Sequence, residues 1–439
     1  MESTTSAALA SRIVARLREA GFQAFLVGGC VRDLLLGIPP KDFDAATDAS
    51  PDQVSALFPA SQRVGAHFGV ALVVEHGARV EVATFRSDHA YEDGRHPARV
   101  AFESDPRRDV LRRDFTINAL LMDPSTGKVL DYVGGRADLD ARVVRAIGDA
   151  AERFREDHLR MLRAIRFAAR LGFSIEESTF QAIRRCKNLI HRVSPERVRD
   201  ELVRILTEGA ARRGFELLDA SGLLDEILPD VARMKGVEQP PRYHPEGDVW
   251  THTLLLLGQL KNPTPSLALS ALLHDVGKPP TFRRADRIRF DGHAALGAAI
   301  TVRILNALRF SNDEIRRVES AVRNHMRFMD APRMKESTLK RFFRLPHFEE
   351  LLELHRIDCL ASHGLLDNYH FVRSKLEELS AAGIHPAPLL TGDDLIRQGY
   401  TPGPRFKEIL TAVEDAQLEG RLRTPEQALA FLRQHFPRE

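Results

Sequence analysis

The spacing of apolar residues changes roughly one third of the way along this chain of 439 residues. Over about the first 150 residues, short apolar runs such as 22–27 and 68–75 alternate with turns and short helical patterns, which predicts an α+β module. From about Glu152 onward apolar residues recur at helical spacing, for example over 157–171 and 196–206. One core rarely serves more than about 250–300 residues, so several domains are expected. The predicted parts are an α+β head over 1–150, an all-α neck and body over 151–240, a helical domain over 241–380 and a helical tail over 381–439.

Composition indicates a folded protein of a reducing compartment. Hydrophobic residues make up 43% and charged residues 28% of the chain, which excludes wholesale disorder. No apolar run is long enough to span a membrane, and the start of the chain carries Glu2 and lacks the apolar core of a secretory signal. Three cysteines that lie far apart (Cys30, Cys186 and Cys359) argue against a disulfide framework. We therefore expect a cytoplasmic protein with no membrane partner.

Charge is balanced over the whole chain but not within it. The net charge is only +2, yet residues 153–213 carry 15 Arg or Lys and 8 Asp or Glu. This local excess predicts one surface that faces a polyanion such as RNA. The alternative is a solvated helical face with ion pairs within the helix. Residues 405–439 carry 6 charges of each sign and are neutral.

A glycine turn follows the first predicted strand. The run 22–27 has the pattern of a buried strand, it ends at Gly28-Gly29, and a helical pattern starts at Val31. Free backbone N–H groups at the start of a helix can bind phosphate. Arg32 adds a guanidinium whose fork suits phosphate oxygens. The turn is therefore a candidate site for a triphosphate.

Two aspartates lie two positions apart on the next predicted strand. Asp42 and Asp44 leave the same face of that strand, and paired carboxylates repel each other unless a divalent cation such as Mg²⁺ neutralises them. Glu81, on a hairpin predicted to turn at His76-Gly77, would supply a third carboxylate. The alternative is that these carboxylates only face solvent, and it is the neighbouring motifs that favour the metal.

A row of charged residues recurs every third position in the predicted helix 157–171. Asp157, Arg160, Arg163 and Arg166 stay near one face of such a helix. Cytosine and adenine share an amino donor beside a ring-nitrogen acceptor, so a carboxylate and a guanidinium side by side would accept C and A and reject U and G. The alternative is a set of surface salt bridges.

Four motifs occur in order in the first half of the chain: Gly28-Gly29-Cys30-Val31-Arg32-Asp33, Lys41-Asp42-Phe43-Asp44, Arg112-Arg113-Asp114-Phe115-Thr116-Ile117-Asn118-Ala119 and Glu156-Asp157-His158-Leu159-Arg160-Met161-Leu162-Arg163-Ala164-Ile165-Arg166-Phe167. With these motifs the chain resembles the bacterial-type (class II) tRNA nucleotidyltransferases, which are the CCA-adding enzymes, and their relatives the bacterial poly(A) polymerases. The resemblance implies a head with the DNA polymerase β-like nucleotidyltransferase fold.

The resemblance also implies roles for single residues. In it Asp42 and Asp44 hold two Mg²⁺ ions, one of which activates the RNA 3′-hydroxyl while the other steadies the departing pyrophosphate. The nucleotide-binding residues that it implies are Gly29 and Arg32 at the triphosphate, Arg113 and Asp114 at the ribose or phosphates, Asp157 and Arg160 at the base, and Arg163 and Arg166 at the nucleotide or phosphates. Asn118 is expected to order the local structure. The polar segment between Arg86 and Asp105, which includes Tyr91, Asp93, Arg95, His96 and Pro97, looks like the flexible loop that accompanies A addition in this family.

A second set of candidate ligands lies in the C-terminal half of the chain. His252, His274, Asp275 and Asp358 have the pattern of the histidine–aspartate (HD) metal-dependent phosphohydrolases, with Leu272-Leu273-His274-Asp275-Val276-Gly277-Lys278 as the core motif. Neutral imidazoles with carboxylates suit Mn²⁺, Ni²⁺ or Fe²⁺ better than Ca²⁺, and Mg²⁺ is a further candidate. His293 and His325 match additional ligands of some HD proteins. The alternative is a degenerate HD domain with structural histidines.

The sequence thus predicts a template-independent enzyme that adds C, C and A to the tRNA 3′ end from ATP and CTP, with an HD phosphohydrolase activity on the same chain. A poly(A) polymerase would share the head motifs, but such enzymes typically end in a strongly basic tail, whereas residues 405–439 are neutral. An enzyme that adds only A would also fit these motifs, and so would a phosphohydrolase whose head only binds RNA. The sequence does not indicate the oligomeric state.

Overall fold

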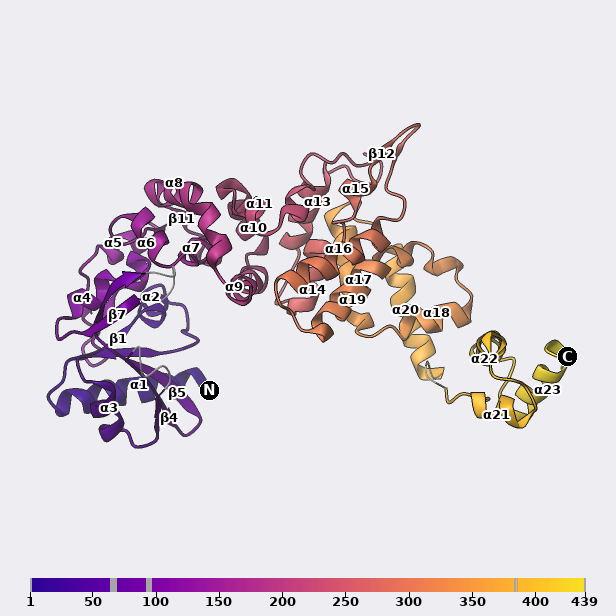
Figure 1. The fold of residues 1–439 in the computed structure, drawn as a ribbon, viewed down its shortest axis with the longest axis horizontal. Coiled ribbons are helices and arrows are strands. Elements are labelled where there is room, and N and C mark those ends of the chain that lie inside the picture. The colour runs from indigo at the N-terminus through magenta and orange to yellow at the C-terminus, as the bar shows by residue number, and fades with distance from the viewer. Residues whose placement is uncertain (1, 64–68, 92–96, 383, 385, 438–439) are drawn as a thin grey trace. The chain divides into compact units, whose positions relative to one another are not determined.

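The chain forms two compact units in its computed structural model, which describes residues 2–63, 69–91, 97–382, 384 and 386–437. One unit comprises Met1–Ala232 with Ala307–Arg309, and the other comprises Arg233–Asn306 with Phe310–Glu439 (Figure 1). The finer division at residues 150, 240 and 380 stays a prediction. No helix of the described residues is long and apolar enough to cross a membrane.

The first unit begins with a mixed sheet and its covering helices. The elements are α1 (Glu2–Glu19), β1 (Ala24–Val27), α2 (Gly29–Leu35), β2 (Asp44–Thr47), α3 (Pro51–Leu57), β3 (Ser61–Arg63), β4 (Val70–Glu75), β5 (Ala78–Thr84), β6 (Arg86–Tyr91), β7 (Pro97–Phe102), α4 (Pro106–Leu111), the 3-10 helix η2 (Thr116–Asn118), β8 (Leu121–Met122), β9 (Val129–Leu130) and α5 (Gly135–Asp140). Seven strands form one sheet in the order β3-β4-β5-β2-β1-β8-β9. Its core includes Val27, Ala46, Phe85 and Leu121, which confirms the predicted α+β head.

The register of the central strands positions the candidate carboxylates. Strand β2 runs antiparallel to β1, with Asp44 opposite Val27, and parallel to β5, with Asp44 opposite Glu81. Strands β4 and β5 form the predicted hairpin at His76-Gly77, and both turn residues have positive φ angles, 49° and 82°. Two positive φ angles are typical of a type I′ turn, whose twist matches that of the flanking strands.

Three local predictions are corrected. The predicted strand 42–46 begins at Asp44, so Asp42 precedes β2. The predicted helix 157–171 begins at Arg160, because Asp157 ends the preceding helix α6 (Ala150–Glu156) with extended φ and ψ angles of −136° and 105°. Part of the polar segment 86–105 forms the hairpin of β6 and β7, while Asp93, Arg95 and His96 lie outside the described residues.

The rest of the first unit is almost entirely helical. Its elements are β10 (Val143–Val144), α6, α7 (Arg160–Leu171), β11 (Ser174–Ile175), α8 (Glu177–Cys186), η3 (Lys187–Arg192), α9 (Pro195–Thr207), α10 (Ala211–Ser221), α11 (Leu223–Ile227) and α12 (Pro229–Ala232). The all-α expectation is therefore correct for the bulk of this region, apart from the short parallel pair β10–β11. Helix α7 packs against α9 and α10.

The second unit is a helical bundle followed by a small helical tail. Its elements are α13 (Val249–Gly258), α14 (Pro265–Leu273), α15 (Lys278–Thr281), β12 (Arg283–Arg284), β13 (Ile288–Arg289), α16 (His293–Ala307), α17 (Asn312–Asn324), η4 (His325–Met329), η5 (Ala331–Arg333), α18 (Glu336–Phe343), α19 (Phe348–Ala361), α20 (Asp367–Ala382), α21 (Gly392–Arg397), α22 (Pro404–Leu418) and α23 (Pro425–His435). Helices α13, α14 and α19 pack against one another. The tail has its own core, which includes Leu395, Ile409 and Val413. All three cysteines of the chain are buried and free.

Candidate functional site

Two of the three candidate carboxylates of the head, Asp44 and Glu81, lie on neighbouring strands of the sheet, and Asp42 just precedes β2. Because Asp44 and Glu81 are opposite each other on parallel strands, their side chains leave the same face. Burial, and then the negative charge of Glu81, raises the pKa of Asp44 to about 6; Asp42 adds to this effect and Arg113 opposes it. Clustered carboxylates, one of which resists ionisation, are a donor set that a hard cation such as Mg²⁺ would stabilise.

The glycine turn faces these carboxylates. Gly28 has a φ of 79°, and a Cβ at this position would lie 3.8 Å from both Asp44 Oδ2 and Arg113 Nη1. Gly29 starts α2, which has only seven residues, so its dipole is small and the charged side chains dominate the local potential. Arg32 is buried, and its Nη1 donates to Asn118 Oδ1 at 2.6 Å. Asn118 therefore orders the site, as predicted from its place in the sequence.

Two ion pairs fix the next motif in place. The buried Asp109 accepts from Arg113 Nη2 at 2.8 Å. Asp114 Oδ2 accepts from Arg163 Nη2 at 2.7 Å, and although burial opposes ionisation, the Arg163 guanidinium keeps the pKa of Asp114 below its usual value. Asn118 Nδ2 donates to the other oxygen of Asp114 at 3.2 Å. The motif thus links the glycine turn to helix α7.

These residues line a cavity of about 420 Å³ in the first unit. This volume is within the range usual for small-molecule sites. Seven basic and five acidic side chains line it: Arg32, Lys41, Arg113, Arg163, Arg166, Arg170, Arg204, Asp33, Asp42, Asp44, Asp114 and Glu208. An excess of basic side chains together with clustered carboxylates suits an anionic ligand that also carries a metal ion.

Arg166 serves this cavity from a buried position. Its side chain is 5% exposed, its Nε donates to Glu201 Oε2 at 2.7 Å, and its guanidinium lies 4.4 Å from the centre of the Phe167 ring. The Arg32 guanidinium lies 5.2 Å from the same ring. The Arg163 guanidinium also lies 5.2 Å from this ring, so Phe167 holds three arginines at the cavity wall through cation–π contacts.

The candidate base-reading residues are close in sequence but bonded to different partners. Asp157 accepts from Arg197 Nη2 at 3.1 Å, and Arg160 Nη1 donates to Glu156 Oε2 at 2.6 Å. Arg160 Nη2 also donates to the Arg112 carbonyl at 2.9 Å. Both residues lie beside the cavity lining rather than in it. The Arg160 backbone N–H donates to the Asp157 carbonyl at 3.0 Å, but the two side chains are held by separate partners.

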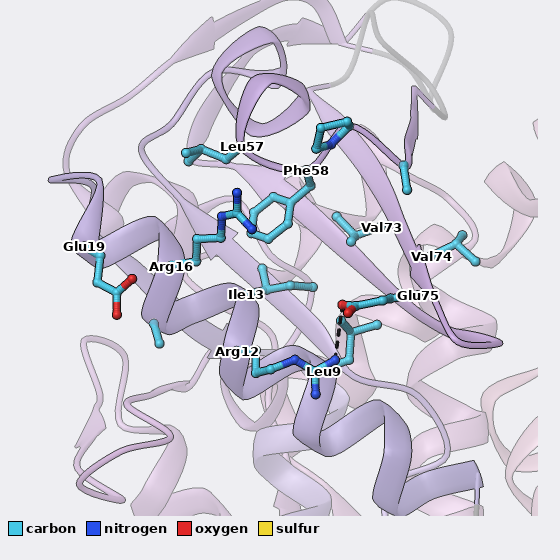
Figure 2. A pocket seen from close by; sticks show the side chains of 13 residues that line it. Leu9, Arg12, Ile13, Arg16, Glu19, Leu57, Phe58, Val73, Val74 and Glu75 are labelled. Carbon is cyan, nitrogen blue, oxygen red and sulfur yellow. Dashed lines mark hydrogen bonds and ion pairs between the residues drawn. The ribbon is translucent and has the colours of Figure 1, made fainter.

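A second cavity of the first unit contains none of the predicted site residues. It measures about 640 Å³ and lies between α1, β4 and the end of α3 (Figure 2). Ile13 and Val73 are buried in its wall, Arg12 forms an ion pair with Glu75 at 3.1 Å, and the Arg16 guanidinium lies 5.4 Å from the centre of the Phe58 ring. Its side chains carry no cluster of catalytic or metal-binding groups.

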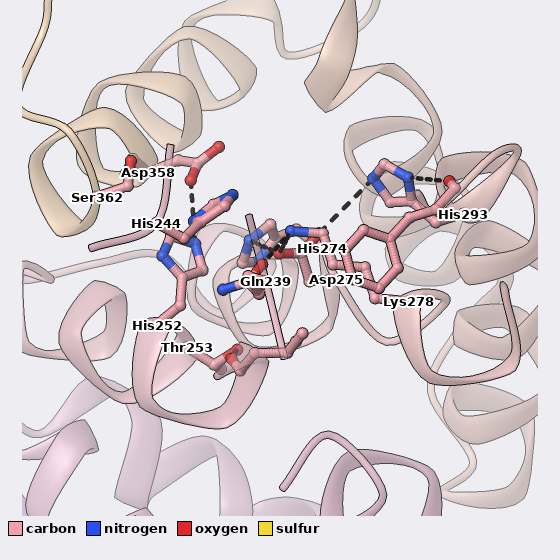
Figure 3. Close-up of polar contacts among 12 residues, drawn as sticks. Gln239, His244, His252, Thr253, His274, Asp275, Lys278, His293, Asp358 and Ser362 are labelled. Carbon is pink, nitrogen blue, oxygen red and sulfur yellow. Dashed lines mark hydrogen bonds and ion pairs between the residues drawn. The ribbon is translucent and has the colours of Figure 1, made fainter. Parts of the chain in front are cut away.

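The second unit gathers all six candidate ligands of the C-terminal half. They come from α13, the end of α14, the starts of α16 and η4, and α19: His252, His274, Asp275, His293, His325 and Asp358. Figure 3 shows all of them except His325. His252, His274 and Asp275 have ligand atoms within 4.8 Å of one another, and so do Asp275, His293 and His325. His252 Nε2 also lies 3.1 Å from Asp358 Oδ1. Asp275 thus belongs to both groups.

The four histidines share one arrangement of their ring nitrogens. Nδ1 of His274, His293 and His325 lies 2.7–2.9 Å from a backbone carbonyl, and Nδ1 of His252 lies 2.8 Å from Glu246 Oε1. The carbonyl contacts place the ring proton of His274, His293 and His325 on Nδ1, so the Nε2 lone pair of these neutral rings faces the centre. Metal-ligating histidines are usually held in this way. Nε2 of His252 lies 3.1 Å from Asp358 Oδ1, and Nε2 of His274 lies 3.1 Å from Asp275 Oδ2, so these nitrogens and carboxylate oxygens face one another. The donor set therefore fits a transition-metal ion.

The charges around this centre are strongly perturbed. Burial disfavours the imidazolium of His252, but Asp358 and Glu246 outweigh it and raise the pKa of His252 to about 9. Burial, followed by the charge of His274, lowers the pKa of His325 to about 4. Burial opposes ionisation of Asp275, yet His274 and Lys278 hold its pKa well below the usual value. Burial also opposes ionisation of Asp358, yet His252 holds its pKa below the usual value. The centre thus keeps two carboxylates ionised among neutral and cationic rings.

Several supporting residues were not among the predicted site residues. Glu246 and Gln239 lie in a stretch with two prolines that has the composition of a linker, and Lys278 is the last residue of the HD core motif rather than one of its ligands. Arg197 lies 40 residues from Asp157, so no local pattern indicates the pair. Arg170 could have been found, because it lies one helical turn beyond Arg166.

Three family models match the chain: "Poly A polymerase head domain" over residues 24–145, "Probable RNA and SrmB- binding site of polymerase A" over 172–235, and "tRNA nucleotidyltransferase domain 2 putative" over 299–432. The sheet, the glycine turn and the paired carboxylates together with the first match define a nucleotidyltransferase head of the DNA polymerase β-like type, followed by a mostly helical body.

Comparison with individual proteins identifies the family within this class of nucleotidyltransferases. A CCA-adding enzyme of Streptococcus mutans is 30% identical over 427 residues, which is 97% of this chain and 96% of that protein. The crystal structure of the Bacillus stearothermophilus CCA-adding enzyme in complex with CTP matches with a TM-score of 0.75 and 28% identity, covering 97% of this chain and 96% of that one. This chain therefore belongs to the family of CCA-adding enzymes, which confirms the resemblance of its motifs.

The similarity is uneven along the chain. A CCA-adding enzyme of Bacillus pumilus is 41% identical over 251 residues, which covers 56% of this chain and only 62% of that relative. The alignment with a Lactobacillus delbrueckii CCA-adding enzyme, at 44% identity, covers 56% of that protein. The assignment of an HD domain to residues 241–380 stays a prediction.

Proposed function

We propose that this chain adds C, C and A to the 3′ end of tRNA, using CTP and ATP and no nucleic-acid template. The observation that carries the proposal is the register that puts Asp44 opposite Glu81 beside the glycine turn and the basic cavity wall. The names of its relatives as CCA-adding enzymes, one of them in complex with CTP, support the substrates.

The residues of the head would have three roles: they would bind the metal ion, bind the triphosphate and orient the nucleotide. Asp42 and Asp44, with Glu81 beside them, would hold Mg²⁺. When bound, the ion would neutralise negative charge as the RNA 3′-oxygen attacks the α-phosphorus and as pyrophosphate departs. Arg32 and the backbone at Gly29 would bind the triphosphate, and Arg113 and Asp114 would orient the ribose and phosphates. Arg163 and Arg166 would keep the cavity wall positive.

Base selection would rest on Asp157 and Arg160. The Asp157 carboxylate would accept from the amino group that C and A share, and the Arg160 guanidinium would donate to the ring nitrogen. Glu156 and the Arg112 carbonyl fix the plane of the guanidinium, while Arg197 fixes the carboxylate. Because each side chain is held by its own partners, the carboxylate acceptor and the guanidinium donor would present the same hydrogen-bonding pattern to C and to A.

The test uses three tRNA transcripts that end before CCA, after the first C and after CC, with CTP and ATP supplied separately. A CCA-adding enzyme extends the first two only when CTP is present and the third with ATP. Extension of the third transcript alone indicates an enzyme that adds only A. Long adenosine tracts on unrelated RNA indicate a poly(A) polymerase.

We propose a second function, a metal-dependent phosphohydrolase activity, for the second unit. The specific observation is the set of four histidines whose Nδ1 atoms are all occupied and whose Nε2 atoms meet Asp275 and Asp358. These residues would hold Mn²⁺, Ni²⁺, Fe²⁺ or Mg²⁺. When bound, such an ion would polarise a phosphate ester and activate a water molecule. Elemental analysis of the purified chain and hydrolysis of phosphomonoesters and cyclic phosphodiesters with each metal test this proposal.

A further inference from the structure

Two buried polar side chains beside the candidate metal centre are outside its ligand set. Gln239 precedes α13 and is 4% exposed, and Lys278 starts α15 and is 6% exposed. Lys278 Nζ lies 2.7 Å from Asp275 Oδ2 and 2.6 Å from Gln239 Oε1. It also lies 5.3 Å from the centre of the Phe290 ring. Figure 3 shows Gln239 and Lys278 with Asp275 and His274.

The Gln239 amide has one orientation that fits its surroundings. A lysine ammonium only donates, so the amide oxygen is the atom that accepts from Lys278, and the amide nitrogen remains for another partner. That nitrogen, Gln239 Nε2, is buried and has no hydrogen-bond partner among the described atoms. Buried donors in proteins are nearly always satisfied, so this N–H group is available to an acceptor that a ligand brings.

We propose that Gln239 and Lys278 form an oxyanion subsite of the centre, which binds a non-bridging phosphoryl oxygen of a phosphate ester. This inference rests on the phosphohydrolase function proposed above. A cation and an amide N–H group both donate hydrogen bonds, so the subsite selects an oxyanion and repels a metal ion. Through Asp275, Lys278 adjoins both groups of ligands, so a phosphoryl group at the subsite lies within the same centre.

The competing explanation is that Gln239 only orients Lys278. The variant Gln239→Glu separates the two, because its carboxylate still accepts from Lys278 but replaces the free N–H group with an acceptor that repels anions. A matched control is Gln434→Glu, which adds the same charge at an exposed position of α23. Both variants leave the head cavity intact, so phosphate bound there cancels in the comparison.

The experiment measures Mn²⁺ content and the calorimetric affinity for inorganic phosphate on the Mn²⁺-loaded full chain. We expect Gln239→Glu to retain Mn²⁺ at the second unit and the thermal stability of the wild type, but to lose the phosphate affinity of that unit by at least about tenfold. Gln434→Glu should match the wild type in all three measurements.

Two outcomes would overturn the inference in distinguishable ways. If Gln239→Glu retains Mn²⁺ and binds phosphate as tightly as the wild type, Gln239 is only structural and the metal centre stands. If the wild type holds no Mn²⁺ beyond that of the head, both the centre and its subsite are wrong. Lys278→Met is a second variant, and undiminished phosphate binding by it would contradict the cationic part of the subsite.

Discussion

Asp44 is the residue at which catalysis and stability of the head oppose each other. Its pKa is raised to about 6 by burial and by Glu81, whereas an aspartate in an unfolded chain ionises near 4. Because the folded-state pKa is the higher one, this group stabilises the fold most at low pH, and the contribution is lost as pH rises through about 6. Ionisation of Asp44 at higher pH therefore lowers the free energy of unfolding, and a bound cation would offset this loss.

We predict that Asp44→Asn abolishes nucleotide addition without lowering the unfolding temperature. The amide cannot replace a carboxylate ligand, and the loss of transition-state stabilisation should be several kcal/mol, about a thousandfold or more in rate. Removing the buried charge should leave stability unchanged or higher. Single-turnover incorporation of ATP into tRNA and thermal unfolding measure the two effects, with the exposed head residue Asp140, changed to Asn, as control. Normal incorporation by Asp44→Asn contradicts the catalytic role.

We predict that Asp157→Ala degrades base selection before it degrades chemistry. Loss of a charged hydrogen bond costs on the order of 1.5–3 kcal/mol, roughly ten- to a hundredfold in the preference for CTP and ATP over UTP and GTP. The measurement is steady-state incorporation of all four nucleotides. Arg197→Ala is the matched control, because it breaks the same ion pair but keeps the carboxylate. Equal loss of selectivity in both variants indicates that only the ion pair matters, and unchanged selectivity in Asp157→Ala refutes base reading.

At the scale of elements, the close approach of α14 and α16 shapes the candidate metal centre. Gly277 follows α14, and a Cβ at this position would lie 2.1 Å from the His293 carbonyl oxygen and 2.7 Å from the Gly297 nitrogen. Backbone atoms cannot yield as a flexible side chain can. The helix that carries His293 would have to move away from Asp275.

We predict that Gly277→Ala destabilises the second unit by about 1–3 kcal/mol and weakens Mn²⁺ binding. Thermal unfolding and metal content are the readouts. The matched control is Gly403→Ala, since Gly403 has extended backbone and a Cβ there would meet no atom nearer than 4.0 Å among the described residues. Equal behaviour of the two alanine variants would show that α14 and α16 tolerate separation.

Elements were predictable from sequence where their signals are local. The helix after Ser50 has a capping box that Gln53 completes, and the hairpin turn His76-Gly77 is specified by its own two residues. The helix predicted from Asp157 begins instead at Arg160, because apolar spacing does not mark the turn between α6 and α7. It depends on the Asp157 side chain, which accepts from the Leu159 backbone N–H at 3.1 Å. Such a bond competes with helix continuation but leaves no trace in periodicity.

The same distinction holds for the two sites. The head carboxylates and the six ligands of the second unit carry motifs, so their residues were named from sequence alone. Their supports were not, because Glu246 and Gln239 have linker-like neighbours and Arg197 pairs across 40 residues. Side-chain chemistry identifies ligands, whereas only the fold identifies what holds them.

At the scale of the whole molecule, the two candidate centres belong to different compact units. The head residues Asp42, Asp44 and Glu81 lie in Met1–Ala232, and the six ligands of the other centre lie in the second unit. Each set is positioned by its own core, the sheet in one case and the packed helices α13, α14 and α19 in the other. We therefore expect a local change at one centre to leave the chemistry of the other intact.

We predict a reciprocal separation of the two activities. His274→Gln keeps an amide that can replace the hydrogen bond to the Ala271 carbonyl but removes a metal ligand, so phosphohydrolase activity and second-unit Mn²⁺ should be lost while CCA addition persists. Asp275→Asn is a poorer choice, because it would leave the buried Lys278 without its carboxylate. Asp44→Asn should show the converse loss. Both activities and the metal content are measured on the same preparations. Loss of CCA addition in a folded His274→Gln protein would show that the second centre acts on the first.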